Sequence, residues 1–317
     1  MICKICKRII ENDGFRYSVQ ERQINDGELF FYELCPNCGT LQIMDAPQKM
    51  EAYYKKDTYY ADAMIPKKHR LSMLVRCVGV QRLITNGGFH MPYTLQYILR
   101  SILPSLMNIY GTGVKRESRI LDVGGGNGSW AYKLFNEWGY KKVTVIDRYC
   151  SEGSFISKDV RYIRGDICEI DMKEKFDLII FNHSFEHMSD PDLVLKKTRE
   201  LMNESSKLLI RIPCIPSMAW NKFRENWYQI DAPRHYFIYS ERAIRMLCNR
   251  HGLEVEHVLC DSKPSQFSIS DQYQNTSLCF DEIALNDRCS LRNVIETIRS
   301  NRMGEGDQAA FYIKLTQ

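Results

Sequence analysis

Four cysteines near the N-terminus stand in two close pairs, Cys3-x-x-Cys6 and Cys35-x-x-Cys38, with 28 residues between the pairs. Each pair can place two sulfurs at one side of a tetrahedron around one ion, as in a zinc ribbon. Four thiolates close the coordination sphere, so we expect a structural Zn²⁺. Coincidental spacing and a redox dithiol are the alternatives. The small size of the module, which needs a stabilising cross-link, disfavours the dithiol.

A glycine loop, Gly124-Gly125-Gly126-Asn127-Gly128, follows a short apolar run and precedes a stretch with helical periodicity. Glycines let the backbone approach a ligand closely, and a helix N-terminus offers free N–H groups. The spacing is Gly-x-Gly-x-Gly, which disfavours the Gly-x-Gly-x-x-Gly chemistry of an NAD-dependent enzyme. Asp122 precedes the loop, and a carboxylate there suits a cation better than a pyrophosphate. S-Adenosylmethionine, with an ammonium and a sulfonium group, fits this pattern.

Two acidic residues mark the ends of the next predicted strands. Asp147 stands 19 residues after Gly128, where a carboxylate can hold both ribose hydroxyls of an adenosine. Asp166 is placed to receive the adenine amino group. A plain tight turn with solvated strand ends is the alternative for the whole pattern.

Strands and helices alternate from Arg119 onward. We expect strands over 119–123, 143–146, 160–164, 176–181, 207–212, 254–259 and 309–315. Helices are expected over 129–138, 191–202 and 240–251, the last with Ser240 as its N-cap. This order predicts an α/β fold with a doubly wound, mostly parallel sheet of seven strands.

Residues 119–317 resemble the class I S-adenosylmethionine-dependent methyltransferases, which have a Rossmann-like fold. The strings that carry the resemblance are Leu121–Gly128, Val143–Asp147, Gly165–Ile167, Phe176–Pro191, Asp231–His235 and Gly306–Ile313. The resemblance implies that the last strand runs antiparallel in the sheet. It also implies a set of cofactor-binding residues: Asp122, Gly124, Gly126, Gly128, Asp147, Asp166, Ile167 and Asn182.

A cysteine-rich module before such a domain resembles the layout of bacterial sugar and glycan methyltransferases. The implied acceptor is a sugar or nucleotide-sugar, methylated on oxygen or carbon. We expect a zinc-ribbon-like module over 1–50, a basic helical linker over 51–117 and the methyltransferase domain over 118–317. Residues 263–305 form an expected insertion between the last two strands, able to cover the acceptor site.

Candidate catalytic residues follow the fourth strand of the domain, where the methyl group of the cofactor should point. Glu186 and His187 stand together there, His183 lies on the same loop, and His235 lies on the same sheet edge. An imidazole near neutral pKa can take a proton from a hydroxyl or an activated carbon acid. The alternative is that these side chains only hold the loop in place.

Positive charge is concentrated in one segment. The chain of 317 residues has a net charge of +4, yet residues 61–117 alone hold 8 basic and 2 acidic residues. A solvated helical face is one interpretation. An anionic acceptor held by residues such as Arg70 and Arg76 is the other. A helix over 67–85 and a second over 93–107 are predicted here.

The composition is that of a globular protein, with 44% hydrophobic and 26% charged residues. No apolar run is long enough to span a membrane, and the N-terminus does not resemble a signal peptide. We therefore expect a cytoplasmic protein. A nucleic-acid methyltransferase is one alternative, although Asn182-His183-Ser184-Phe185 lacks the Asn/Asp-Pro-Pro-aromatic motif of amine-methylating enzymes. A scaffold that keeps the fold without catalysis is another.

Overall fold

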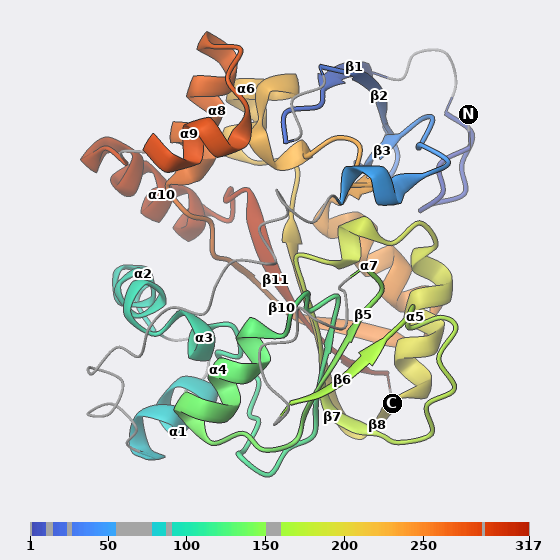
Figure 1. Cartoon of the computed structure of the whole chain (residues 1–317), viewed down its shortest axis with the longest axis vertical. Coiled ribbons are helices and arrows are strands. Elements are labelled where there is room, and N and C mark those ends of the chain that lie inside the picture. The colour runs from blue at the N-terminus through green and yellow to red at the C-terminus, as the bar shows by residue number, and fades with distance from the viewer. Residues whose placement is uncertain are drawn as a thin grey trace.

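The computed structural model of the chain describes residues 2–10, 15–23, 27–54, 78–86, 91–149, 160–286 and 289–316. These residues form a seven-stranded sheet with helices on both faces and a four-stranded sheet beside it (Figure 1). No helix in the described ranges is long and apolar enough to cross a lipid bilayer.

The large sheet has the strand order β10-β11-β8-β7-β4-β5-β6. Its strands are β4 (Ile120–Val123), β5 (Val143–Asp147), β6 (Arg161–Arg164), β7 (Phe176–Asn182), β8 (Met202–Pro213), β10 (Leu253–Cys260) and β11 (Gln308–Leu315). The strands from β4 to β8 pair in parallel, whereas β11 lies between β8 and β10 and runs antiparallel to both. The predicted α/β class, the mostly parallel seven-stranded sheet and the antiparallel last strand are confirmed.

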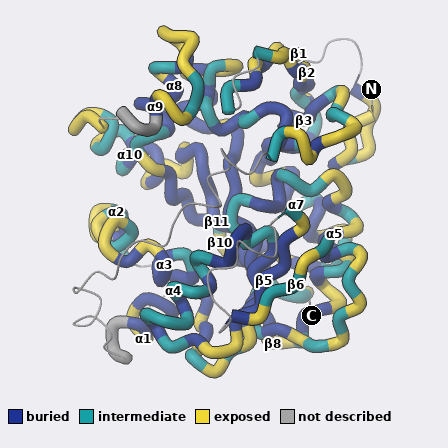
Figure 2. The backbone as a smooth tube through the Cα atoms, in the orientation of Figure 1, coloured by how far each residue is buried: buried dark blue, intermediate teal, exposed yellow. Residues whose placement is uncertain are grey.

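The central strand β7 is apolar on both faces because helices cover both. Leu178 and Ile180 pack with α3 (Pro104–Met107) and α4 (Ser129–Trp138). Ile179 and Phe181 point the other way, toward α5 (Pro191–Glu200) and α7 (Glu241–Arg250). This alternation follows from the two-residue period of a strand. Burial is accordingly deepest along the central strands (Figure 2).

Two predicted helix boundaries are wrong. The helix expected over 93–107 is broken into α2 (Tyr93–Ile102) and α3, because Pro104 lacks an N–H and disfavours helical geometry at Leu103, whose φ is −126° and ψ 52°. The helix expected to reach Met202 ends at Glu200, and Met202 instead starts β8 and pairs with Phe176. Of the helix predicted over 67–85, residues 67–77 lie outside the described residues, and α1 spans Val78–Asn86.

The small sheet joins the N-terminal region to a later segment of the chain. Strands β1 (Phe15–Gln20), β2 (Leu29–Leu34) and β3 (Leu41–Ile43) form an antiparallel meander. Its fourth strand is β9 (Phe237–Ile238), which pairs antiparallel with β3. The N-terminal residues therefore support the backbone directly after His235.

The remaining elements lie over the ends of the large sheet. The segment between β10 and β11 folds as α8 (Ser265–Asn275), α9 (Phe280–Asn286) and α10 (Leu291–Met303), which lie together beside α6 (Figure 1). The other elements are η1 (Met50–Tyr53), η6 (Phe185–His187), α6 (Met218–Phe223), η7 (Arg224–Asn226) and η8 (Tyr228–Ile230). The domain boundaries drawn from the sequence stay predictions.

Candidate functional site

The glycine loop connects β4 to α4 at the carboxyl edge of the parallel strands. Gly124 has a φ of 72°, and a Cβ there would lie 2.4 Å from the Cβ of Ser184. Ser184 is itself fixed, because its hydroxyl donates to the carbonyl of Val123 at 2.5 Å. Only glycine fits this position, so no side chain at residue 124 covers the backbone of the loop where it lines the adjoining cavities.

Two cavities meet at this loop. The smaller, of about 350 Å³, extends along the ends of β5 and β6. The larger, of about 540 Å³, lies between the glycine loop, η8 and the start of α8. Gly124 and His183 line both cavities, so the two cavities lie side by side at this junction.

The smaller cavity contains the acidic residues expected to bind adenosine. Asp147 accepts the N–H of Gly126 through Oδ2 and that of Tyr149 through Oδ1, both at 2.9 Å. Asp166 accepts a hydrogen bond from the N–H of Cys168 through Oδ1 at 2.9 Å and one from Nη1 of Arg148 through Oδ2 at 3.2 Å. Each carboxylate has further lone pairs for a hydroxyl or an amino group. Ile167 also lines this cavity and supplies an apolar wall.

Aromatic residues complete the smaller cavity. Tyr54 stacks on Tyr149 with ring centroids 4.4 Å apart, and its hydroxyl lies 2.9 Å from Nδ1 of His187. Tyr236 lines the same cavity. The neighbouring Tyr53 packs on Phe30. Tyr59 and Tyr60 lie outside the described residues.

The larger cavity is lined mainly by polar side chains. Asp122 and Asn182 lie on its floor beside the glycine loop, with Trp130, Tyr228 and Gln229 also in the lining. Burial, together with the charge of Asp147, raises the pKa of Asp122 to about 8. Asp122 is therefore mostly protonated at neutral pH, and a cationic ligand nearby would favour its ionised form.

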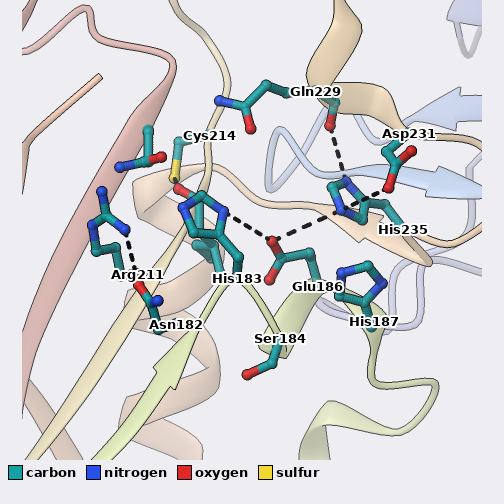
Figure 3. A network of polar contacts seen from close by, with 12 residues as sticks. Asn182, His183, Ser184, Glu186, His187, Arg211, Cys214, Gln229, Asp231 and His235 are labelled. Carbon is teal, nitrogen blue, oxygen red and sulfur yellow. Dashed lines mark hydrogen bonds and ion pairs between the residues drawn. The ribbon is translucent and has the colours of Figure 1, made fainter. Parts of the chain in front are cut away.

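The carboxyl group of Glu186 lies between the rings of His183 and His235 (Figure 3). Glu186 is fully buried, and neither of its oxygens has a hydrogen-bond partner among the described residues. Its Oε1 lies 3.6 Å from Nδ1 of His183 and 3.9 Å from Nε2 of His235. Burial raises the pKa of Glu186 to about 8, with Asp231 adding to the rise and Arg211 opposing it.

The three histidines near Glu186 have different surroundings. The backbone of His183 has a φ of 54°, which is unusual for a residue other than glycine. Its ring is partly exposed and lines both cavities. The Nδ1 of His235 lies 2.9 Å from the carbonyl of Gln229. Burial lowers the pKa of His235 to about 4, that of His187 to about 3 and that of His183 also. All three are therefore neutral at pH 7.

The predicted catalytic residues lie close together but do not all line the same cavity. The ligand atoms of Glu186, His187 and His235 lie within 4.8 Å of one another. His235 lines the larger cavity, His187 the smaller, and Glu186 neither. His183, a weaker candidate from sequence, is the histidine at the junction.

The four N-terminal cysteines come together as expected from their spacing. Cys3 and Cys38 have their sulfurs 3.6 Å apart, as do Cys6 and Cys35, and all four sulfurs lie within 4.8 Å of one another. Zn–S bonds of about 2.3 Å in a tetrahedron place sulfurs about 3.8 Å apart. The donor set and its dimensions therefore fit one zinc ion.

The basic segment contributes structural contacts where it is described. Arg100 pairs with the buried Asp261 at 2.8 Å, and Arg116 donates to Gln81 at 2.7 Å. Arg70 and Arg76, the expected anion contacts, lie outside the described residues.

The chain is similar in sequence to known methyltransferases. The profile of a methyltransferase-domain family matches residues 94–258, just over half of the chain. The chain is 25% identical over 116 residues to an (S)-coclaurine N-methyltransferase of Thalictrum flavum subsp. glaucum, covering 34% of this chain and 32% of that protein. It is 26% identical over 117 residues to a malonyl-[acyl-carrier protein] O-methyltransferase of Paenibacillus sp. (strain JDR-2), covering 33% of this chain and 42% of that protein. The matches thus span less than half of each curated relative.

Solved structures of methyltransferases also resemble the chain, with low sequence identity. One is the geranyl diphosphate C-methyltransferase of Streptomyces coelicolor A3(2), with a TM-score of 0.48, 12% identity and coverage of 72% of this chain and 85% of the other. Another is an S-adenosylmethionine-dependent methyltransferase of Archaeoglobus fulgidus, with a TM-score of 0.42, 17% identity and coverage of 73% and 97%. The family profile spans the glycine loop, both acidic strand ends and the Glu186 loop, and the chain therefore belongs to this methyltransferase-domain family.

Proposed function

We propose that this enzyme methylates an oxygen or carbon atom of a saccharide or nucleotide-sugar in the larger cavity. The observation that carries the proposal is the position of His183, which lines both cavities and whose Nδ1 lies 3.6 Å from the buried carboxyl group of Glu186. The lining suits a sugar, because Asn127 and Gln229 offer amides to hydroxyls and Trp130 and Tyr228 offer flat apolar faces.

The smaller cavity and the glycine loop are the proposed cofactor site. When bound, S-adenosylmethionine supplies a methyl group activated by a positively charged sulfur. Asp147, Asp166 and Ile167 would hold the adenosine part. The bare backbone of Gly124, Gly126 and Gly128, with Asp122 and Asn182, would hold the amino-acid part. The space that a Cβ at Gly124 would fill supports this fit.

His183, Glu186 and His235 are proposed to take the proton that the acceptor loses. The Nδ1 of His183 faces Glu186, so its Nε2 is the nitrogen that can reach an acceptor hydroxyl. An ionised Glu186 orients the ring and stabilises the imidazolium, the role of a buried carboxylate beside a general base. His235 lies on the other side of the same carboxyl group, with its Nε2 3.9 Å from Glu186 Oε1 and 3.7 Å from Asp231 Oδ2. His187 lies on the cofactor side and would position Tyr54.

The N-terminal module is proposed to bind one structural Zn²⁺ through Cys3, Cys6, Cys35 and Cys38. Its position supports a role in shaping the acceptor cavity. The hydroxyl of Tyr32 donates to the carbonyl of His235 at 2.8 Å, and the N–H of Ile43 donates to that of Tyr236 at 3.0 Å. The zinc would thereby hold the residues that follow η8.

A methyl-transfer assay tests the proposal. The zinc-loaded enzyme is incubated with S-adenosylmethionine carrying a labelled methyl group and with panels of nucleoside-diphosphate sugars, free sugars and RNA. We expect label in a sugar, lost in the Asp147→Ala variant. Label only in RNA, with binding that weakens steeply as salt increases, would instead support the nucleic-acid alternative.

A further inference from the structure

Three side chains bring unpaired polar atoms into one small volume beside the two cavities (Figure 3). They are Glu186 and His187 of η6 and His235, and one ligand atom of each lies within 4.8 Å of the others. Both carboxyl oxygens of Glu186 and Nε2 of His187 are buried and have no hydrogen-bond partner in the described part of the chain. Buried polar groups are normally satisfied, so the cluster suits a partner that the chain itself does not supply.

The hydrogen bonds of the two imidazole rings decide which nitrogen keeps a lone pair. Nδ1 of His235 lies 2.9 Å from the carbonyl oxygen of Gln229, and Nδ1 of His187 lies 3.1 Å from that of Arg234. A carbonyl oxygen only accepts, so each Nδ1 carries the proton and each neutral ring has its lone pair on Nε2. The hydroxyl of Tyr54, beside the same Nδ1 of His187, can accept as well. Histidines that bind metals are typically fixed in this way.

A proton cannot satisfy this group of acceptors. Nε2 of His235 lies 3.9 Å from Oε1 of Glu186, which is longer than a hydrogen bond. A proton on Glu186 could in any case serve only one of the two histidines. The guanidinium group of Arg234 is engaged by Asp231 through two hydrogen bonds. One cation between the three side chains, in contrast, satisfies the carboxylate and both Nε2 atoms together.

We propose that Glu186, His187 and His235 bind a divalent metal ion through one carboxylate oxygen and the two Nε2 atoms. Two imidazoles and a carboxylate suit first-row ions such as Mn²⁺, Fe²⁺ and Zn²⁺. Bonds of about 2.1 Å place neighbouring ligand atoms about 3 to 3.5 Å apart, so small side-chain rotations close the site.

The proposed ion is accessible from both cavities. His187 lines the smaller cavity and His235 the larger one, so the ion can enter between them. Three protein ligands leave coordination positions open. We therefore expect this ion to exchange more readily than one enclosed by the four N-terminal thiolates.

The ion would act on the proposed base through Glu186. Metal binding displaces the proton of a ligating carboxyl group, so Glu186 would be ionised at pH 7 and able to orient His183. Without the ion, burial raises the pKa of Glu186 to about 8. This consequence rests on the function proposed above, whereas the binding of the ion does not.

Binding of Mn²⁺ to the zinc-loaded chain tests the site. Mn²⁺ binds more weakly than zinc to thiolates, so it leaves the four cysteines occupied. Electron paramagnetic resonance of the free ion gives the number of bound ions and their Kd. The variants are Glu186→Gln and His187→Gln, with Glu254→Gln and His257→Gln as matched controls at exposed positions of β10. Thermal unfolding verifies that each variant is folded.

The wild type should bind about one Mn²⁺ per chain. Each ligand variant should raise the Kd by about tenfold or more, and the two controls should leave it unchanged. Pulsed resonance of the bound ion should show couplings to histidine nitrogen that change when the histidines carry nitrogen-15.

The proposal is overturned if Mn²⁺ does not bind, if the ligand variants bind it as tightly as the wild type, or if the bound ion shows no nitrogen coupling. None of these measurements involves an acceptor or turnover, so a wrong sugar assignment would leave their results unchanged.

Discussion

The hydroxyl of Tyr54 lies 2.9 Å from Nδ1 of His187, although 133 residues separate the two in sequence. Tyr54 follows the N-terminal sheet, whereas His187 follows the central strand of the large sheet. The contact brings an N-terminal aromatic ring over the proposed cofactor cavity, where it stacks on Tyr149. The N-terminal region thus contributes directly to that cavity.

Replacing Tyr54 should therefore weaken cofactor binding. The contacts with Tyr149 and His187 hold the ring of Tyr54 in the cavity wall, and losing an aromatic contact with the ligand costs about 1 to 1.5 kcal/mol, so Tyr54→Ala should raise the Kd of S-adenosylhomocysteine by about tenfold. Tyr54→Phe keeps the stacking and should lose only a few-fold. Calorimetry measures both, and an unchanged Kd for Tyr54→Ala would show that the ring does not contact the ligand.

The rate of methyl transfer should depend on the ionisation of Glu186. Its pKa of about 8 means that at pH 7 the carboxyl is largely protonated. That form cannot orient a histidine as a base. Hence kcat/KM for the acceptor should rise with pH and level off above about 8. Glu186→Gln should be slower and lack this rise. A wild-type profile that is flat from pH 6 to 9 would contradict the prediction.

Cofactor binding should release a proton from Asp122. The pKa of this carboxyl is about 8 in the unliganded protein, and an ammonium nearby would lower it, so the proton leaves when the ligand binds near neutral pH. The apparent binding enthalpy should then differ between phosphate and Tris at pH 7, by an amount that reflects the ionisation enthalpies of the two buffers. Asp122→Asn should abolish that difference. Equal enthalpies for the wild type in both buffers would place the ligand cation elsewhere.

Metal removal should affect both stability and turnover. Elemental analysis should find about one zinc per chain, and Cys35→Ser should lose it. Loss of the ion should lower the Tm and also the rate, since Tyr32 and Ile43 hold the backbone at His235 and Tyr236. Cys248→Ser, at a buried cysteine of α7, is the matched control and should keep its zinc. Protein purified without chelators that contains no zinc would refute this role of the cysteines.

Sequence alone predicted the parts of the site that are local in the chain. The strand, glycine loop and helix from Ile120 to Trp138 were read correctly because one continuous segment encodes them. The strand ends at Asp147 and Asp166 followed from the same alternation of strands and helices. The pairing of the cysteines followed from their spacing.

Contacts between distant segments were not predicted. A two-residue strand such as β9 has no periodicity to detect, and its pairing with β3 depends on the tertiary fold. The break at Leu103 could have been predicted from Pro104.

The central claim is that His183, oriented by Glu186, takes the proton of the acceptor at the junction of the two cavities. The most direct measurement compares kcat with the Kd of S-adenosylhomocysteine for the wild type, His183→Gln and the exposed control His257→Gln. The account predicts that His183→Gln lowers kcat by about 100-fold or more, changes Kd little, and that His257→Gln changes neither. A His183→Gln enzyme with a kcat close to that of the wild type would contradict it.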